Sequence, residues 1–285
     1  MKNILKKIKY RLRIFINSIY FYNDYVKAFF VYQKNKKSYK NIEKFCFFIG
    51  YPRSGHSVVG SILDAHKNII ISHELDVLKY IDQGLKKEII YGLILRNSLL
   101  KSTRGREQTG YKYDIPNEWQ GRFAELKIIG DKKGGRTSVR IQRKKSLFKD
   151  IEKKLDIKVV FIHVIRNPYD NISTIFSRSR NLSLEGSIES YFSRCEAVMI
   201  TKREFGKDVL DFYYEDLVKD TKRSIDKLCK FLDVKCYSNY IENCSNLLFE
   251  DLHKSRFDVK WNNKLINIVK KEIKKYPFLK NYTFE

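Results

Sequence analysis

The chain has 285 residues, of which 43% are hydrophobic and 14% are aromatic, enough for the core of one α/β domain with a small extension. Four prolines and 13 glycines leave little room for disordered linkers, and a net charge of +24 favours phosphate-bearing or other anionic partners. Five cysteines and five histidines follow no metal-ligand spacing, so we expect no metal site and reduced thiols, as in a cytoplasmic protein.

The first 44 residues form a basic extension. They carry twelve Lys and Arg against two acidic residues, a net +10 of the total charge. Residues 14–32 are rich in Phe, Ile and Tyr, but polar residues interrupt them too often for a membrane-spanning helix, which needs about 20 apolar residues. We expect residues 1–44 to form an amphipathic helical extension of a domain comprising residues 45–285. It would lie either on an anionic membrane surface, making the protein peripheral there, or on the domain's own core.

Five short apolar segments predict strands, and helical patterns follow them. The predicted strands are residues 45–49, 68–72, 127–131, 158–165 and 209–214, and the helical patterns are 58–66, 75–100, 138–155 and 217–231. Pro168 is expected in the first turn of a further helix, where its missing N–H costs nothing. Strands that alternate with helices favour a P-loop-type α/β fold, with a mostly parallel sheet of about five strands flanked by helices.

The turn after the first predicted strand has the spacing of a phosphate-binding loop. Residues 50–57 read Gly-Tyr-Pro-Arg-Ser-Gly-His-Ser, with His56 where a nucleotidase carries lysine. A strand, a glycine-containing turn and a helix direct backbone N–H groups and the helix dipole at an anion. Arg53 is the loop's cation. We therefore expect the loop to hold a phosphate without the lysine and Mg²⁺ that cleave a β–γ bond. The alternative is an ordinary strand-to-helix turn.

Chemically functional side chains follow the other predicted strands as well. Glu74, Lys132, Arg166 and Tyr214 lie at or just after strand ends, as Arg53 does. Ligands of parallel sheets bind at the carboxyl ends of the strands, so these side chains are expected to converge. Taken singly, each of these residues also has an ordinary explanation. Glu74 could be an acidic residue at a helix N-terminus and Lys132 a surface lysine. Arg166 could be a structural ion-pair partner and Tyr214 a core residue. Their common placement indicates a binding site.

Across residues 45–262, the motifs and their order resemble the sulfotransferases that use 3′-phosphoadenosine 5′-phosphosulfate (PAPS), most closely the tyrosylprotein and glycan branch. Residues 52–57 are similar to the family's 5′-phosphosulfate loop, with His56 where the family usually has Thr. Residues 130–132 (Gly-Asp-Lys) are similar to the motif of the family's catalytic lysine, and residues 166–170 (Arg-Asn-Pro-Tyr-Asp) to its 3′-phosphate turn.

The resemblance implies a role for each candidate residue. Glu74 would be the general base, with His73 as the alternative, and Lys132 would stabilise the leaving oxygen. The implied donor-binding residues are Arg53, Ser54, Gly55, His56 and Ser57 in the loop, Arg166, Thr174 and Arg178 after the fourth strand, Tyr214 on the adenine side, and Ser255 and Lys260 in a closing segment. Ser173 could replace Thr174 as the hydroxyl that contacts the 3′-phosphate. No metal is implied.

The acceptor and two other protein classes remain open at this point. The basic segments 101–122 and 178–204 are expected to shape the acceptor cleft, and a carbohydrate or glycolipid hydroxyl is the expected acceptor, with an acidic peptide as the alternative. A P-loop kinase or nucleotidase would need a Mg²⁺ ligand, for which Asp131 is available. A non-catalytic basic protein would bind a membrane or nucleic acid, although no nucleic-acid motif is present. An inactive relative of the sulfotransferases would be consistent with the departures at His56 and Thr174.

Overall fold

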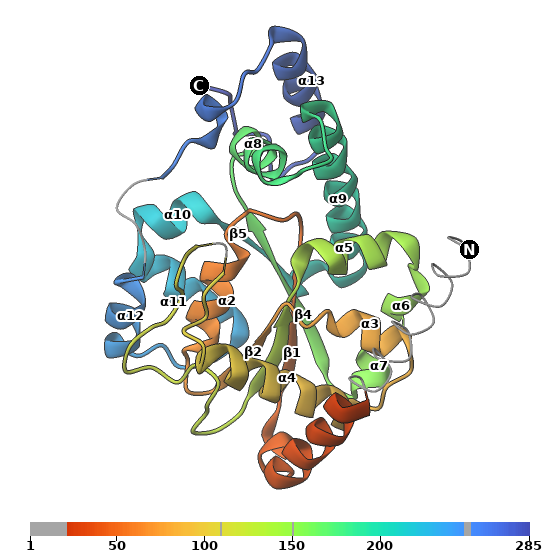
Figure 1. The fold of residues 1–285 in the computed structure, drawn as a ribbon, viewed down its shortest axis with the longest axis vertical. Helices are drawn as coiled ribbons and strands as arrows, with labels where there is room; N and C mark the ends of the chain where they lie inside the picture. The colour runs from red at the N-terminus through yellow and green to blue at the C-terminus, as the bar shows by residue number, and fades with distance from the viewer. Residues whose placement is uncertain (1–21, 109, 150, 248–251) are drawn as a thin grey trace, which may run out of the picture.

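The computed structural model describes residues 22–108, 110–149, 151–247 and 252–285. Its centre is a sheet of five parallel strands in the order β2-β3-β1-β4-β5 (Figure 1). The strands are β1 Lys44–Ile49, β2 Ile69–His73, β3 Ile128–Lys132, β4 Lys158–Ile165 and β5 Val209–Tyr213. The predicted fold class is confirmed, and each strand ends within one residue of the segment expected from its apolar run.

Helices cover both faces of the sheet (Figure 1). The α-helices are α2 His56–Asp64, α3 Val77–Asp82, α4 Lys87–Ser102, α5 Gly134–Arg143, α6 Ser146–Lys149, α7 Ile151–Leu155, α8 Pro168–Arg178, α9 Leu184–Phe205, α10 Tyr214–Lys219, α11 Thr221–Leu232, α12 Ser238–Ser245 and α13 Asn263–Ile273. Short 3₁₀ helices lie at η1 Ser38–Asn41, η2 Gly206–Asp208 and η3 Ser255–Asp258.

Three predicted helical stretches are broken in the structure. The pattern over 75–100 is divided between α3 and α4, the stretch 138–155 among α5, α6 and α7, and the stretch 217–231 between α10 and α11. The last break lies at Asp220, whose side chain accepts a hydrogen bond from the Arg223 N–H and so caps α11. Helix α8 begins at Pro168 as expected, and Asn167 caps it.

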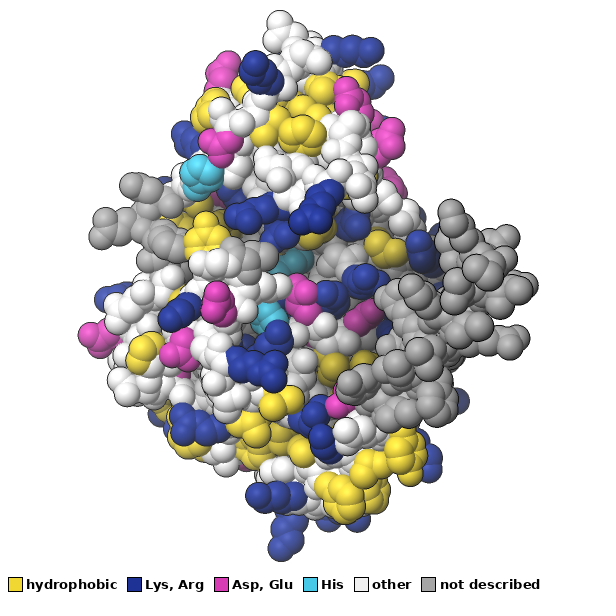
Figure 2. Space-filling model, viewed as in Figure 1, with side chains coloured by type: hydrophobic (Ala, Val, Ile, Leu, Met, Phe, Trp, Pro, Cys, Tyr) yellow, Lys and Arg dark blue, Asp and Glu magenta, His cyan; other side chains and the backbone are white. Residues whose placement is uncertain are grey.

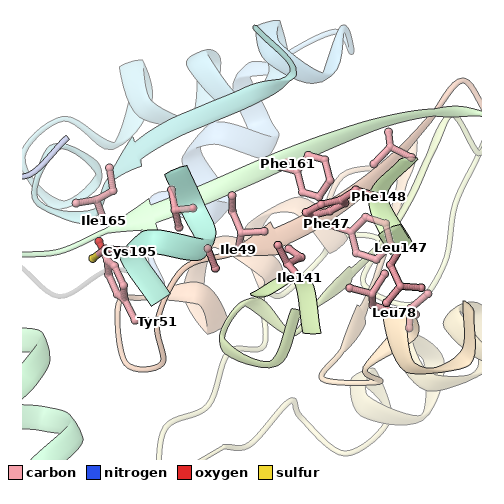
Figure 3. Close-up of a cluster of buried hydrophobic side chains, with 14 of the residues drawn as sticks. Phe47, Ile49, Tyr51, Leu78, Ile141, Leu147, Phe148, Phe161, Ile165 and Cys195 are labelled. Carbon is pink, nitrogen blue, oxygen red and sulfur yellow. The ribbon is translucent and has the colours of Figure 1, made fainter. Parts of the chain in front are cut away.

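Alternate residues of β1 enter two different cores. Cys46 and Phe48 pack with the apolar sides of α2, α11 and α12. Phe45, Phe47 and Ile49 face the other way and pack with residues of α5, α7 and α9, part of which Figure 3 shows. Because both faces of the sheet are covered, the central strand β1 is a continuous apolar run after Lys44 rather than an alternating one.

The order of the strands places a crevice at the carboxyl end of β1. The chain runs from β1 to β2 at one edge, returns to β3 beside β1, and then crosses to β4 on the other side of β1. Open parallel sheets bind ligands where the chain changes direction in this way. The glycine-containing loop 50–57 leaves β1 at that point, and α2 begins directly after it.

The described part of the N-terminal extension docks on α4. Residues 22–35 are helical, and Ala28 is fully buried where it meets Gly92. Asp24 forms an ion pair of 2.8 Å with Arg96. The first part of the predicted amphipathic extension, residues 1–21, lies outside the described residues. Across the described ranges, every helix is too short or too polar to traverse a bilayer.

Candidate active site

A cleft of about 1960 Å³ opens at the carboxyl edge of the sheet. Figure 2 shows it as a hollow near the middle of the face, with dark blue Lys and Arg side chains around it. Its lining comes from the loop after β1, the end of β3, Arg166 after β4, the second half of α8, the start of α10 and the segment 252–258. Segments far apart in sequence therefore meet at the edge where the strand-end residues were expected to converge.

The loop after β1 contains strained backbone and closely packed groups. Arg53 has a φ of +71°, which a residue with a side chain rarely adopts and which is found most often at functional sites. Gly55 has a φ of +100°, and a Cβ at this position would lie 2.4 Å from the ring of Tyr214. Glycine at position 55 thus lets the first residue of α10 pack directly on the loop.

The side chains of Ser54 and His56 are buried, and of the two only His56 belongs to the lining of the cleft. Ser54 is fully buried, and its Oγ donates a hydrogen bond to the Tyr51 carbonyl at 3.2 Å. The His56 ring lies edge-on to Phe48, and its Nε2 lies 3.1 Å from the Ile49 carbonyl. Burial, assisted by the charge of Lys132, lowers the pKa of His56 to about 3, so the ring is neutral. At these two positions, the groups available to an anion are the backbone N–H groups at the start of α2.

Lys132 is the centre of a polar cluster on the wall of the cleft. Its Nζ lies 3.1 Å from Ser57 Oγ, 3.3 Å from Glu74 Oε1 and 3.3 Å from Gln108 Oε1. Glu74 Oε2 accepts a second ammonium contact, at 2.6 Å, from Lys133. The structure therefore brings together the two residues predicted to be catalytic, Glu74 and Lys132, with the last residue of the loop.

Burial and pairing shift the pKa values of this cluster. Burial lowers the pKa of Lys132 to about 8, against the opposing effect of the Glu74 carboxylate. Partial burial acts to raise the pKa of Glu74, but the charges of Lys132 and Lys133 outweigh it and hold that pKa well below its ordinary value. Near neutral pH the cluster therefore consists of a carboxylate between two ammonium groups.

A second polar group lies where the fourth strand ends. Arg166 Nη2 donates to the His253 carbonyl at 2.6 Å and to Ser255 Oγ at 3.2 Å, and Thr174 Oγ1 lies 3.1 Å from the same Ser255 oxygen. All four residues line the cleft. Ser173 is fully buried, and its Oγ accepts a hydrogen bond from Trp261 Nε1 at 2.9 Å. Of the two candidate hydroxyls, Thr174 is thus the one that faces the cleft.

The remaining predicted residues are placed differently from one another. Arg178 and Tyr214 line the cleft, and burial raises the pKa of Tyr214. Lys260 is exposed and is not part of the lining. His73 is buried beside Lys132 and is likewise not part of it. The structure therefore gathers Arg178 and Tyr214 with the other strand-end residues, and leaves Lys260 outside.

Sequence reasoning missed a basic wall on α5. Arg136, Arg140 and Arg143 line the cleft beside Arg194 of α9. Arg140 forms two hydrogen bonds with Asp76, of 2.9 and 2.7 Å. The spacing of the three α5 arginines, i, i+4 and i+7, is that of one helix face and could have identified this wall. From the predicted acceptor segment 101–122, Gln108, Tyr111 and Tyr113 reach the cleft, and from the segment 178–204, Arg178 and Arg194 reach it.

Asp131, the residue available to a kinase as a metal ligand, has a structural role. It is fully buried and accepts hydrogen bonds from Ser72 Oγ and from the N–H groups of Leu75 and Val77. These bonds fix the chain between β2 and α3. Within the described ranges, moreover, no group of three or more His, Cys, Asp or Glu residues is arranged to hold a metal ion.

Comparisons with known proteins point to one family. Residues 158–238 match the model of the sulfotransferase family. The chain is 27% identical over 212 residues to a protein-tyrosine sulfotransferase of Drosophila melanogaster. The matched region covers 69% of this chain and 39% of that protein. The chain thus matches about two fifths of the length of this curated relative.

Solved structures share the fold. A sulfotransferase from Mycobacterium avium superposes with a TM-score of 0.50 at 12% identity, over 92% of this chain and 85% of that one. The sulfotransferase domain of an olefin synthase from Synechococcus gives a TM-score of 0.47 at 19% identity, over 79% and 83% of the two chains. The family match and the curated relative confirm the resemblance to the PAPS-dependent sulfotransferases, and the structure from Mycobacterium avium shows that the fold is shared.

Proposed function

We propose that this chain transfers a sulfuryl group from PAPS to a hydroxyl group of an acceptor by in-line displacement. The observation that carries the proposal is the pair of anion-binding groups in one cleft. Loop 50–57 with Lys132 forms one, and Arg166 with Thr174 and Ser255 forms the other. A donor with a 5′-phosphosulfate and a 3′-phosphate requires two such sites.

The residues present fit the two anionic groups of the donor. Both hydrogen bonds of Arg166 to described residues use Nη2, so Nε and Nη1 remain available for a bidentate phosphate contact. At the other group, the N-terminus of α2 supplies N–H groups, and Ser57 and Lys132 supply a hydroxyl and a charge. When bound, the donor supplies the sulfuryl group, and the tasks of the chain are positioning, charge stabilisation and proton removal.

Lys132 couples the two catalytic roles. In its present position it contacts Glu74, and two ammonium groups make that carboxylate a weak base. An anion at the loop attracts Lys132 Nζ, which already lies within hydrogen-bonding distance of Ser57. As Lys132 moves toward the leaving oxygen, Glu74 loses one of its two counter-charges and its basicity increases. This movement of the Lys132 side chain would thus place a positive charge at the leaving oxygen and at the same time make Glu74 a stronger base.

Glu74 is favoured over His73 as that base. Glu74 lines the cleft with an exposed fraction of 37%, whereas His73 is 5% exposed and is not part of the lining. A general base must come within about 3 Å of the hydroxyl whose proton it removes. An acceptor in the cleft can approach the Glu74 carboxylate but would have to displace other groups to reach the imidazole.

For the acceptor, we propose a carbohydrate or glycolipid hydroxyl. The cleft is wide, and its wall on α5 presents Arg136, Arg140 and Arg143, which suit an acceptor with anionic groups of its own. The second candidate is a tyrosine side chain of an acidic peptide, because the curated relative is a protein-tyrosine sulfotransferase. Anionic groups on either acceptor would complement the positive charge of the basic wall, so the experiment has to distinguish the two acceptors.

The test measures transfer of label from [³⁵S]PAPS to a panel of glycans, glycolipids and tyrosine peptides. We expect transfer to a carbohydrate-containing acceptor, and Glu74→Gln should lower turnover by about 10²-fold or more while nucleotide affinity changes little. Glu242→Gln, an exposed site on α12, is the matched control and should leave turnover unchanged.

Three results would contradict this proposal at different levels. Labelling of tyrosine peptides alone would replace the acceptor and keep the reaction. An absence of transfer to every acceptor, combined with Mg²⁺-dependent transfer of the γ-phosphate of ATP, would replace the reaction by that of a kinase. Full activity of Glu74→Gln would exclude Glu74 as the base.

A further inference from the structure

The N-terminal helix (residues 22–35) exposes a row of aromatic rings, which we call the aromatic face. It comprises Tyr22, Tyr25, Phe29 and Phe30, with exposed fractions of 70%, 38%, 41% and 65%. Figure 2 shows yellow side chains gathered at the lower end of the molecule, where Figure 1 has this helix. Soluble proteins rarely leave several large aromatic side chains together in water, so the aromatic face indicates an interaction surface.

The aromatic face is held outward by the docking of the opposite face. Besides the contacts of Ala28 and Asp24 with α4, Tyr32 stacks on Tyr39 with ring centroids 5.0 Å apart. Tyr39 in turn lies 5.6 Å from the ring of Tyr91 in α4. Since the inner side of the helix is fixed in this way, the helix cannot bury the aromatic face by rotating without losing these contacts.

Five exposed lysines accompany the aromatic face, two of them on the same helix and three in the segment that follows it. Those of the described extension that are exposed are Lys27, Lys34, Lys36, Lys37 and Lys40. Its two acidic residues are already paired, Asp24 with Arg96 and Glu43 with Lys127. Across the described ranges, the five lysines have no ion-pair partner. The described extension therefore combines an exposed aromatic helix face with five positive charges that lack ion-pair partners among the described residues.

We propose that the aromatic face binds the surface of an anionic membrane, with its rings among the lipid headgroups and its lysines at the lipid phosphates. Helices that lie in a membrane interface typically carry aromatic and apolar residues on one face and Lys or Arg on the polar face. Each lysine near an anionic leaflet strengthens binding by about fivefold, and aromatic rings anchor at headgroup depth. This inference does not depend on the proposed reaction.

Two alternative occupants of the aromatic face are a second copy of this chain and residues 1–21, and charge disfavours both. A second copy docked face to face would bring two sets of five unpaired lysines together. Residues 1–21 carry six Lys and Arg and no acidic residue, so this segment would likewise bring like charge to the aromatic face. The same six charges would instead add to the attraction of an anionic bilayer.

The test is sedimentation of the full chain with vesicles of phosphatidylcholine, with and without phosphatidylserine. We expect binding only to the anionic vesicles and release by 1 M salt, at which the screening length falls to about 3 Å. Tyr22→Ser combined with Phe30→Ser should weaken binding by about tenfold or more, because each ring loses its burial in the interface. Ile268→Ser, an exposed apolar site on α13 at the opposite end of the molecule, should not weaken it.

A charge variant gives an independent measurement should the aromatic variant fold poorly. Lys34→Glu combined with Lys37→Glu should also weaken binding by about tenfold or more, whereas Lys270→Glu combined with Lys271→Glu on α13 should not. Equal binding to neutral and anionic vesicles, or equal binding of both charge variants, would overturn the proposal. So would a dimer in analytical ultracentrifugation that the change at Tyr22 and Phe30 converts to a monomer, since a second copy would then be the occupant.

Discussion

Replacing Arg166 by alanine is expected to remove most of the preference of this chain for a nucleotide with a 3′-phosphate. Arg166 follows the carboxyl end of β4, and its guanidinium lies with the hydroxyls of Thr174 and Ser255 in the lining of the cleft. No residue of this group belongs to the loop that would hold the 5′-phosphate. The substitution should therefore act on one end of the nucleotide.

The magnitude follows from the exposure and chemistry of this group. A hydrogen bond to a charged partner contributes about 1.5–3 kcal/mol, which is roughly a tenfold to hundredfold change in affinity. Arg166 is partly exposed, so solvent screening places the expected loss toward the lower end of that range. Thr174→Ala removes a neutral donor and should cost less, on the order of 0.5–1.5 kcal/mol.

The measurement is isothermal titration calorimetry of adenosine 3′,5′-bisphosphate and adenosine 5′-monophosphate, without added metal. Native protein should bind the bisphosphate more tightly, and Arg166→Ala should weaken the bisphosphate while leaving the monophosphate nearly unchanged. Lys264→Ala, an exposed site on α13, controls for the loss of a single positive charge. Equal affinities of the native protein for the two nucleotides would refute the assignment. An equal loss for both in the variant would mean that Arg166 positions the segment 252–258 instead.

Two further predictions concern the loop and the lysine beside it. Gly55→Ala should lower nucleotide affinity and the melting temperature, because a Cβ would lie 2.4 Å from the Tyr214 ring at a φ of +100°, and adding Tyr214→Ala should restore part of the melting temperature. An unchanged melting temperature would contradict this packing. The value of kcat/KM should fall as pH rises through about 8, because burial lowers the pKa of Lys132 to about 8 and only the protonated amine stabilises the leaving oxygen. Lys132→Arg should shift that decline to higher pH, and an unshifted decline would assign it to another group.

The strands and the position of the site could be predicted because they depend on local patterns. Strands covered on both faces are uninterrupted apolar runs, and such runs are visible in β1 and β4 without knowledge of the fold. Once the sheet is known to be parallel, residues that follow strands must meet at one edge. This is why Glu74, Lys132 and Arg166 could be grouped although 92 residues separate the first from the last.

What could not be predicted depends on contacts between distant segments. The 22 residues of α9 were expected only as a segment that shapes the acceptor cleft, and the structure shows that one face of this helix packs into the core. Gln108 lies in an irregular segment, and its contact with Lys132 arises only when that segment folds across the cleft. Whether the N-terminal helix docks on the domain or faces outward was also open. In the structure one face of the helix packs on the domain, and the aromatic face is exposed.

The histidine in the loop illustrates how a departure from the usual motif is accommodated. The His56 ring is largely buried against Phe48 at the wall of the cleft, and its Nε2 contacts the Ile49 carbonyl. A Cβ at position 134 would lie 2.4 Å from His56 Cε1, so the ring fits because α5 begins with Gly134. The ring thus takes up space between the loop and α5 and leaves the backbone N–H groups of α2 free to face an anion. Since those groups, rather than the side chain at position 56, form the N-terminal anion site of a helix, histidine at this position is compatible with binding of the donor.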